Sequence, residues 1–258
     1  MSAAPPLLDV QNVSLAFKGV KALTDLSFAV PRGEICALIG PNGAGKSSLL
    51  NVINGIYRAN AGEITIDGEP FHRPTPMGAA RRGVGRTFQN NALFRRMSVL
   101  DNVLTGLTRL GRASLLEIAF RVGRHPAERR AFRAQAAAAI DLLEIGPYRD
   151  TLVGGLPYGL QKRVEVARAL VAEPKLLLLD EPMAGMNADE KADLGRLIAE
   201  VNRAQGTTVV LIEHDIGIVM GLSHHVVVLD YGRKVGDGSP AEVRANPDVI
   251  AAYLGTKH

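Results

Sequence analysis

The sequence predicts an α/β fold with a mainly parallel, buried sheet and an inserted helical lobe. Three observations predict it. Short apolar or alternating runs fill the first 70 residues, helical patterns fill the middle third, and strands alternate with helices in the last third. Strands that are connected by helices usually pair in parallel. A run that is apolar throughout, such as Leu176–Leu179, is typical of a strand covered on both faces.

Four strands and one helix are expected in the first 70 residues. The strands are LLDVQNVSLAF, LSFAV, EICALIG and GEITIDG, and the helix runs from about Lys46 to Asn54. Turn sequences with glycine, such as Lys18-Gly19 and Asp67-Gly68, separate the strands. This part of the chain is therefore predicted to be rich in β-structure.

The middle of the chain, about residues 97–172, is expected to be helical, and Gly146-Pro147 ends one of its helices. The last third then reads as the strand KLLLLD, helix 189–204, the strand TTVVLIE, helix 215–222, the strand HVVVLD and two short terminal helices. The helical middle is accordingly expected to be an insertion in an α/β core.

Composition favours a globular protein with one large domain. The chain has 258 residues, 47% of them hydrophobic and 22% charged, which excludes a disordered chain. The single cysteine, Cys36, lies in an apolar run and excludes a disulfide framework. Because the chain starts without a signal-peptide pattern and no apolar run approaches the roughly 18 residues of a membrane span, we expect a soluble or peripheral protein.

Positive charge is concentrated in residues 73–133. This block holds thirteen arginines and no lysine against three acids, a local balance of +10 in a chain whose net charge is +4. Such a block suits nucleic acid, anionic lipid or an acidic protein partner, and a solvated helical face is the alternative. Few aromatic residues lie among the arginines, which disfavours single-stranded nucleic acid.

The segment GPNGAGKS, Gly40–Ser47, matches a phosphate-binding loop between a strand and a helix. Its glycines let backbone N–H groups curl around phosphate oxygens, and the helix start adds a partial positive charge. Lys46 is expected to reach the β- and γ-phosphates, and the Ser47 hydroxyl is expected to bind Mg²⁺. The loop therefore predicts binding of a nucleoside triphosphate.

Two further strand ends carry polar residues. In LLLLDEP, we expect Asp180 to hold Mg²⁺ or its water and Glu181 to take a proton from an attacking water; two solvated acids are the alternative. In LIEHD, we expect His214 to hydrogen-bond the γ-phosphate or to hold that water. The alternative here is a metal cluster, whose spacings match no zinc pattern. That cluster would use Glu213, His214, Asp215, His224 and His225.

The stretch LPYGLQKRVEVARAL, residues 156–170, reads as a helix that begins after a glycine turn. Its apolar residues fall on one face, and Lys162, Arg163 and Arg168 are expected to lie in water. The residues alone leave two interpretations open. The stretch is either a loop that enters a helix or an anion site built on the free N–H groups of the helix start.

Together these motifs resemble an ATP-binding-cassette (ABC) ATPase in order and spacing, over essentially the whole chain. The resemblance rests on Gly40–Ser47, Gln89 in GRTFQN, residues 156–170, Leu176–Glu181 and His214. It implies a P-loop NTPase core with an N-terminal antiparallel β subdomain and an inserted α-helical subdomain. Residues 1–258 would form one ABC ATPase domain, with 1–90 and 173–258 as the RecA-like core and β subdomain and about 91–172 as the helical signature subdomain.

The resemblance also implies the cofactors, ATP and Mg²⁺, and the site residues. In this family two cassettes hold two ATPs, each between the phosphate loop of one subunit and the signature helix of the other. The implied catalytic residues are Glu181, His214 and Lys46, and the implied Mg²⁺ ligands are Ser47, Gln89 and Asp180. The ATP bound by the chain itself is implied to contact Phe17, which stacks on adenine, and the loop residues Asn42, Gly43, Ala44, Gly45, Lys46, Ser47 and Ser48. The ATP held by the partner cassette is implied to contact Pro157, Tyr158, Gly159 and Gln161.

Two positions depart from the family pattern. The signature Leu-Ser-Gly-Gly-Gln reads here as Leu156-Pro157-Tyr158-Gly159-Leu160, so the serine hydroxyl is absent and Pro157 offers no N–H. The helix start remains, and we expect its anion site to be weaker by one charge-assisted hydrogen bond, about 1.5–3 kcal/mol. The aspartate expected in the dimer-contact loop is Asn187. Both changes bear on how well two copies of this chain pair.

A tyrosine before the signature glycine and the segments GVGRTFQNNALFRRMSVLDNV and NPDVIAAYLG resemble the LivG-type ATPase of branched-chain amino-acid importers. The resemblance implies a peripheral subunit at the cytoplasmic face of the inner membrane, on two transmembrane permease subunits. Its partner there is a second, LivF-type cassette or a second copy of itself, and a periplasmic solute-binding protein acts indirectly. Related small polar solutes are alternative cargo.

The arginine block is then expected to meet the permease subunits or anionic lipid, with no nucleic-acid partner. The alternative function is a soluble ABC ATPase that acts on nucleic acid or ribosomes, with the arginines as its binding surface.

Overall fold

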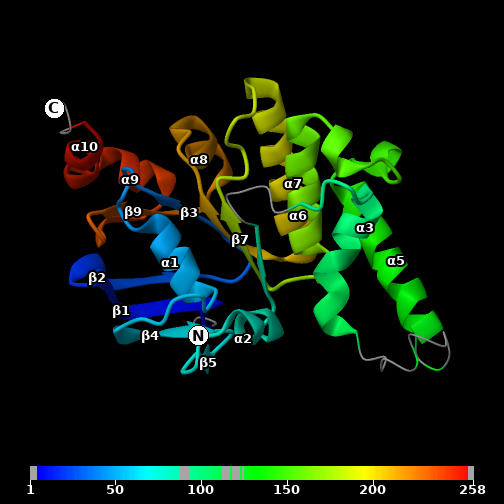
Figure 1. Cartoon of the computed structure of the whole chain (residues 1–258). Coiled ribbons are helices and arrows are strands. Elements are labelled where there is room, and N and C mark those ends of the chain that lie inside the picture. Colours follow the sequence, from blue (N-terminus) through cyan, green and yellow to red (C-terminus); the bar gives the residue numbers. More distant parts are fainter. Residues whose placement is uncertain (1–4, 88–92, 112–116, 118–122, 124, 255–258) are drawn as a thin grey trace. The chain divides into compact units, whose positions relative to one another are not determined.

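The computed structural model describes residues 5–87, 93–111, 117, 123 and 125–254 (Figure 1). The chain divides into two compact units. Unit 1 comprises Met1–Arg86 and Lys175–His258, and unit 2 comprises Thr87–Pro174. The helical segment is thus inserted between two parts of the chain that fold together.

Unit 1 begins with a small antiparallel sheet of strand order β2-β1-β4-β5. Its strands are β1 (Leu8–Phe17), β2 (Val20–Val30), β4 (Ala61–Ile66) and β5 (Glu69–Pro70). Lys18 and Gly19 turn the chain between β1 and β2, and both have a positive φ, which glycine adopts without strain. The N-terminal antiparallel sheet agrees with the fold implied by the resemblance.

The second sheet of unit 1 has the order β10-β9-β3-β8-β7-β6. All its neighbouring strands pair in parallel except β9 and β10, which confirms the mainly parallel sheet. Every residue of β3, β7 and β8 is buried. The strands are β3 (Ile35–Ile39), β6 (Val84–Arg86), β7 (Leu176–Asp180), β8 (Thr208–Ile212), β9 (His225–Asp230) and β10 (Arg233–Gly238).

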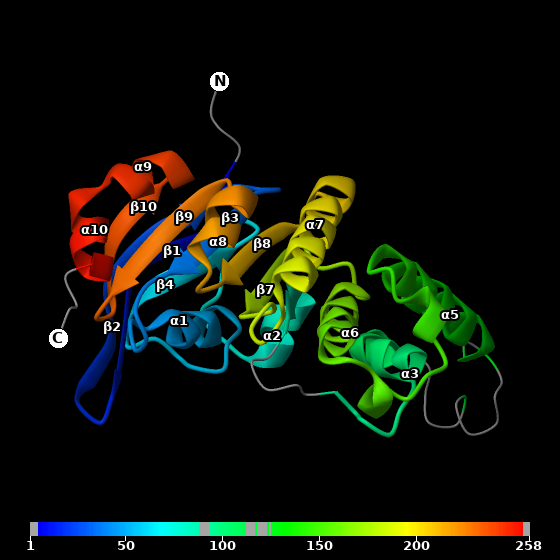
Figure 2. The same ribbon diagram turned by 90° about the horizontal axis from the view of Figure 1, so that it is seen from above.

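Helices cover both faces of this sheet (Figure 2). Cys36 and Leu38 of β3 belong to a buried cluster with Leu49 of α1, whereas Ala37 and Ile39 belong to a second cluster with residues of α8 and α9. Alternate side chains of a strand point to opposite faces, so β3 contributes to both cores. The helices of unit 1 are α1 (Lys46–Ile53), α2 (Pro76–Arg81), α7 (Ala188–Gln205), α8 (Ile216–Leu222), α9 (Pro240–Ala245) and α10 (Pro247–Leu254).

Four elements of unit 1, namely β5, α2, β6 and β10, were not expected from the sequence. β6 has only three residues and depends on pairing with β7 for its strand conformation. β10 contains Gly236 and Gly238, exposes Arg233 and Lys234 and lacks apolar alternation, because it lies at the edge of the sheet. Short edge strands carry little periodic signal, so only the folded sheet reveals them.

Unit 2 is helical, as expected for the middle of the chain. Its α-helices α3 (Val99–Leu104), α5 (His125–Leu142) and α6 (Tyr158–Leu170) pack against one another. Three short 3₁₀ segments, Thr105–Leu110, Gly146–Tyr148 and Val153–Gly155, complete its described part. In the described parts of both units, no helix is long and apolar enough to cross a bilayer.

Asn102 on α3 fastens the loop that enters this helix. Its side chain is fully buried, and its Nδ2 donates to the backbone oxygens of Phe94 and Ser98, each at 3.0 Å. Its Oδ1 accepts a hydrogen bond from the Phe94 N–H at 2.8 Å. One buried amide therefore ties the loop to α3. The Phe94 and Ser98 oxygens also accept hydrogen bonds from the Met97 and Asn102 N–H groups, whereas the Phe94 N–H is paired with the Asn102 side chain.

We expect Asn102→Ala to lower the free energy of unfolding by about 1–3 kcal/mol, because the substitution removes the hydrogen bonds of a fully buried amide and leaves the Phe94 N–H without its acceptor. Urea denaturation measures the loss, and amide exchange of Phe94 should accelerate. The matched variant Gln205→Ala, at an exposed position, should change the stability by less than about 0.5 kcal/mol. Equal stability of the two variants would refute this role of Asn102.

Candidate active site

Three adjacent parallel strands of unit 1 end at the same edge of the sheet. Leu38 of β3 pairs with Ile212 of β8, and Ile212 pairs with Asp180 of β7. The loop Gly40–Ser47 follows β3, Glu181 follows β7, and the pair Glu213-His214 follows β8. Ligand sites of parallel sheets lie at such carboxyl ends, so the register brings together three motifs that are far apart in the sequence.

The phosphate-loop residues adopt the conformation that the glycines of the motif allow. Gly40, Gly43 and Gly45 all have positive φ, and a Cβ on Gly40 would lie 2.1 Å from the Leu229 oxygen. Larger residues would therefore not fit at Gly40. The remaining predicted phosphate contacts follow in order: Asn42 and Gly43 are exposed, Ala44 is buried, and Ser47 and Ser48 lie half-buried in the first turn of α1.

Lys46 is 6% exposed and turns back across its own loop. Its Nζ donates to the Gly40 oxygen at 2.6 Å and to the Pro41 oxygen at 3.0 Å. Burial lowers the pKa of Lys46 below its ordinary value, while the nearby charges of Glu181 and Asp180 oppose this shift. The ammonium is thus held at the loop by backbone oxygens, beside two carboxylates.

Asp180 ends β7, is 3% exposed and lies beside an arginine. Arg86 of β6 places its Nη2 3.3 Å from Asp180 Oδ2, and its Nη1 donates to Asn51 Oδ1 at 2.8 Å. Burial raises the pKa of Asp180, and the positive charge of Arg86 counters that rise. Sequence reasoning missed Arg86, because it stands among many arginines and its strand is too short to be foreseen.

Glu181 and His214 form a direct pair. Nε2 of His214 lies 2.8 Å from Glu181 Oε1, and the Glu181 side chain is 17% exposed. The backbone N–H of Glu181 donates to the Ile212 oxygen at 3.0 Å, and Glu181 has a φ of 50°, an uncommon conformation for a non-glycine residue. The structure thus brings together the two residues that the sequence suggested for handling the attacking water.

Glu213 links the loop that follows β7 to the loop that follows β8. It is 4% exposed, and its Oε1 accepts a hydrogen bond from the Met183 N–H at 2.8 Å, while its Oε2 accepts one from the His214 N–H at 3.3 Å. Burial raises the pKa of Glu213, and these two hydrogen bonds favour the charged form. Sequence reasoning considered Glu213 only as a metal ligand, since its neighbours across the sheet are invisible in the sequence.

The residues of the alternative metal cluster have separate partners. Asp215 caps α8 and pairs with Lys191 at 3.1 Å, whereas His225 pairs with Asp237 at 2.5 Å. His224 Nδ1 accepts a hydrogen bond from the Ile35 N–H. Across the described ranges, no group of three or more His, Cys, Asp or Glu side chains is arranged to hold a metal ion.

One predicted ATP contact, Phe17, belongs to the antiparallel sheet, and one predicted Mg²⁺ ligand, Gln89, lies outside the described residues. Phe17 ends β1, is 42% exposed and meets the ring of Tyr57 edge-on, with ring centres 5.0 Å apart. An exposed aromatic side chain beside a second ring is available for stacking. Gln89 lies outside the residues that the structure describes.

The signature stretch starts helix α6 of unit 2. Pro157 is the N-cap residue, and no side chain caps the helix. Gln161 Nε2 donates to the Leu156 oxygen at 2.8 Å, and Tyr158 is 44% exposed while Gly159 is buried. The side-chain amide of Gln161 thus points back to the turn before α6. The first backbone N–H groups of α6 have no acceptor within the helix and give its start a partial positive charge.

The expectation that Lys162 lies in water is wrong. Its side chain is 2% exposed, with Nζ 3.3 Å from Glu165 Oε2 and 5.7 Å from the centre of the Tyr158 ring. A buried ammonium requires a counter-charge, which Glu165 supplies at i+3. Arg163 is also largely covered, at 12% exposure of its side chain, and lies 3.6 Å from Glu144; Arg168 is half-buried.

Asn187 has a structural role at the position where the family pattern has aspartate. Its Oδ1 accepts a hydrogen bond from the Glu190 N–H at 2.9 Å, and Glu190 Oε2 accepts one from the Asn187 N–H at 3.0 Å. This reciprocal pair is a capping box at the start of α7. Asparagine and aspartate cap helices about equally well, so the departure keeps the helix start intact.

Comparisons with known proteins agree with this geometry. A family model described as ABC transporter matches residues 23–184, and one described as Branched-chain amino acid ATP-binding cassette transporter matches residues 233–258. The high-affinity branched-chain amino acid transport ATP-binding protein BraF of Pseudomonas aeruginosa is 39% identical over 253 residues, or 97% of this chain and 98% of BraF. The corresponding protein LivG of Escherichia coli strain K12 is 37% identical over the same shares of both chains.

A solved structure is also similar to this chain. The ADP conformation of an ATP-binding cassette of an ABC transporter has a TM-score of 0.84 and 30% identity, over 98% of this chain and 100% of that chain. The likeness therefore extends over both units rather than over the phosphate loop alone.

We expect Asn187→Ala to lower the free energy of unfolding by about 1 kcal/mol, because the cap of α7 is lost, and Asn187→Asp to preserve the stability. Thermal denaturation compares the three proteins, and amide exchange at Glu190 should accelerate only in the alanine variant. If the alanine variant matches the parent in both measurements, Asn187 is not the cap.

Proposed function

The chain belongs to the ABC transporter ATP-binding family and is an ATP-hydrolysing cassette, and from this premise we propose that it powers the import of branched-chain amino acids or a related small polar solute. The observation that carries the proposal is the convergence of Lys46, Asp180, Glu181 and His214 where three parallel strands end. The match of residues 233–258 to a branched-chain amino acid transporter model supports the cargo class.

The phosphate loop supplies the binding half of the site. Backbone N–H groups from Gly43 to Ser48 face the phosphates, and Lys46 offsets the negative charge of the β- and γ-phosphates. Phe17, exposed at the end of β1, stacks on the adenine. Because Lys46 is already held by the Gly40 oxygen, its ammonium needs little reordering when ATP arrives.

The oxygen donors at this edge fit Mg²⁺, which prefers carboxylate and hydroxyl ligands. Ser47 in the first turn of α1 and the buried Asp180 would hold the ion or its water, together with Gln89. When bound, Mg²⁺ offsets the charge that develops on the phosphate oxygens. Arg86 opposes the rise in the pKa of Asp180 that burial causes, and so favours the anionic form that serves as a ligand.

Glu181 is placed to activate the attacking water. The water oxygen bonds to the γ-phosphorus, the bond to the β–γ bridging oxygen breaks, and Glu181 accepts the proton of the water. His214 orients the Glu181 carboxylate through their 2.8 Å contact and is close enough to this edge to hydrogen-bond the γ-phosphate. Glu213 acts as a positioning residue, because it ties the His214 N–H to the loop that follows Glu181.

The start of α6 serves the ATP of a second cassette. We infer that unit 2 is the signature subdomain and that Tyr158, Gly159 and Gln161, with Pro157, form this surface. The missing serine weakens the grip on the γ-phosphate, which favours a different, LivF-type cassette as the partner over a second copy of this chain. Both cassettes would work on two permease subunits at the cytoplasmic face of the membrane, with a periplasmic binding protein that delivers the cargo.

The arginines of residues 73–133 divide between structure and surface. Arg86 is committed to Asp180, and Arg82 covers the ring of Phe71 at 4.8 Å. In unit 2, six described arginines of the block are exposed, and the five other than Arg109 are available for the permease subunits or anionic lipid. They are Arg95, Arg96, Arg129, Arg130 and Arg133.

We expect Glu181→Gln to reduce ATP hydrolysis about 10²–10⁴-fold while ATP binding is retained, because the amide cannot accept the proton of water. Phosphate release by the chain co-purified with its transporter complex measures hydrolysis, and equilibrium dialysis measures binding. Glu173→Gln is the matched control, since Glu173 has a φ of 49° like the 50° of Glu181 but lies at an exposed turn. Undiminished phosphate release in the Glu181 variant would overturn the assignment of the base.

A further inference from the structure

Arg86 of β6 lies between the two elements that carry the proposed Mg²⁺ ligands Ser47 and Asp180. Ser47 stands in the first turn of α1, and Asp180 ends β7. The Arg86 guanidinium donates through Nη1 to Asn51 Oδ1 of α1 at 2.8 Å and through Nη2 to Asp180 Oδ2 at 3.3 Å. A single side chain thus joins the helix that follows the phosphate loop to the strand end that carries Asp180.

The sheet fixes the side to which Arg86 points. Arg86 pairs with Leu178 of β7, which is two residues before Asp180. Paired residues of neighbouring strands, and residues two apart in one strand, project from the same face of a sheet. Leu178 belongs to the buried cluster that also contains Leu49 of α1. Arg86 and Asp180 therefore project toward the face that α1 covers, where their side chains are only 6% and 3% exposed.

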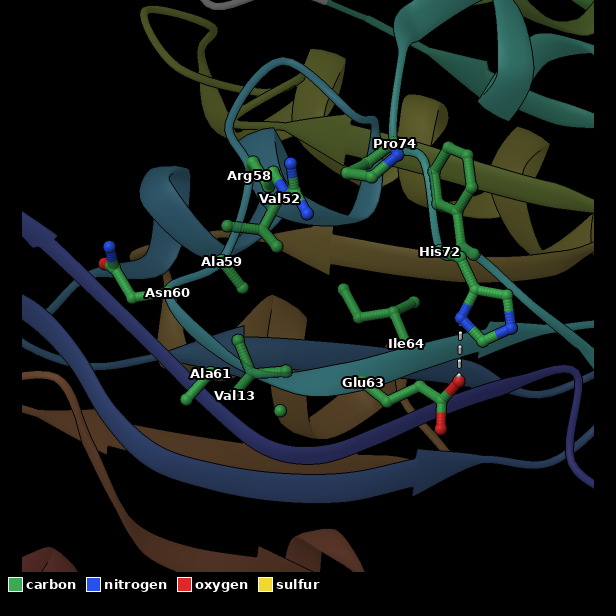
Figure 3. A pocket seen from close by; sticks show the side chains of 12 residues that line it. Val13, Val52, Arg58, Ala59, Asn60, Ala61, Glu63, Ile64, His72 and Pro74 are labelled. Carbon is green, nitrogen blue, oxygen red and sulfur yellow. Dashed lines mark ion pairs between the residues drawn. The ribbon is translucent and has the colours of Figure 1, made fainter.

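Asn51 lies on the same side of α1 as Ser47, because residues four apart on a helix share a face. The backbone of Asn51 is also held, since its oxygen accepts hydrogen bonds from the N–H groups of Ile56 at 2.8 Å and Tyr57 at 3.1 Å. The next residue, Val52, lines a hollow of about 400 Å³ beside β4 (Figure 3). The two neighbouring side chains thus have different surroundings, and that of Asn51 is directed to Arg86.

We propose that Arg86 and Asn51 position Asp180 relative to the first turn of α1 and thereby favour Mg²⁺ over larger divalent ions. Mg²⁺ requires near-ideal octahedral geometry with ligands at roughly 2.0–2.1 Å, whereas Ca²⁺ accepts longer and more variable distances. A carboxylate that binds a metal is commonly oriented by an outer hydrogen-bond partner, and loss of such a partner typically costs about 10–100-fold in metal affinity. The inference rests on the proposed function, because ATP and Mg²⁺ must bind at this edge of the sheet.

The forked geometry of the guanidinium, in addition to its charge, gives Arg86 this role. Arginine donates in two directions from one rigid plane, whereas a lysine ammonium is a single point charge on a flexible chain. Two substitutions separate the fork from the charge. Arg86→Lys keeps a positive charge beside Asp180 but cannot hold both partners in the same way, and Asn51→Leu keeps the whole arginine but removes its acceptor on α1.

Calorimetric titration of the full chain with the non-hydrolysable analogue β,γ-imido-ATP tests this role. The parent chain should bind the analogue more tightly with Mg²⁺ than with EDTA. In Arg86→Lys and Asn51→Leu this gain in affinity should be largely lost, by about tenfold or more, while the affinity in EDTA should not change. Asn51→Asp keeps an acceptor for Arg86 and should retain the gain. With Ca²⁺ in place of Mg²⁺, Arg86→Lys and Asn51→Leu should lose less affinity, because Ca²⁺ tolerates a displaced ligand.

The matched controls are Arg82→Lys, at a half-buried arginine that packs on an aromatic ring, and Asn246→Leu, at a half-buried asparagine whose side chain accepts one backbone hydrogen bond. Both should retain the full gain. A gain that survives in Arg86→Lys and Asn51→Leu would overturn this inference alone. So would an equal loss with Ca²⁺ and Mg²⁺, or an equal loss with EDTA and Mg²⁺. A parent chain that binds no analogue in either medium would refute the proposed function as well.

Discussion

Hydrogen bonding between the parallel strands β7, β8 and β3 sets the position of every group in the candidate active site. The pairs Leu38–Ile212 and Ile212–Asp180 align the three strand ends, and the loops that follow inherit this alignment. A shift by one residue would turn each strand's side chains to the opposite face and carry Asp180 away from Arg86. Because all three strands are buried on both faces, packing opposes such a shift.

The same edge of the sheet holds buried charges, each of which would destabilise the fold if it had no partner. Lys46, Asp180 and Arg86 are largely covered, and each lies near a group of opposite charge or a backbone oxygen. Removing one partner leaves an uncompensated buried charge, which costs more than the pair contributes. The network therefore constrains which side chains can be substituted, and its opposite charges counter the effect of burial on the pKa values of Asp180 and Lys46.

Much of this arrangement could be predicted from the sequence, because its signals are local. The phosphate loop, the apolar strands and their terminal carboxylates are contiguous motifs, and the pairing of Glu181 with His214 follows from two strand ends. Arg86, Glu213 and the burial of Lys162 could not be predicted, since each depends on a partner distant in space or on packing within a unit. The capping role of Asn187 is intermediate, because its spacing to Glu190 is visible in the sequence but the reciprocal hydrogen bonds are seen only in the folded helix.

The most direct test is a crystal structure of the Glu181→Gln variant with ATP and Mg²⁺. The account predicts the triphosphate in the loop Gly40–Ser47, the γ-phosphate within hydrogen-bonding reach of Lys46, and the side chains of residue 181 and His214 on its far side. A triphosphate bound elsewhere, or one bound in the loop with His214 and residue 181 turned away from the γ-phosphate, would contradict it.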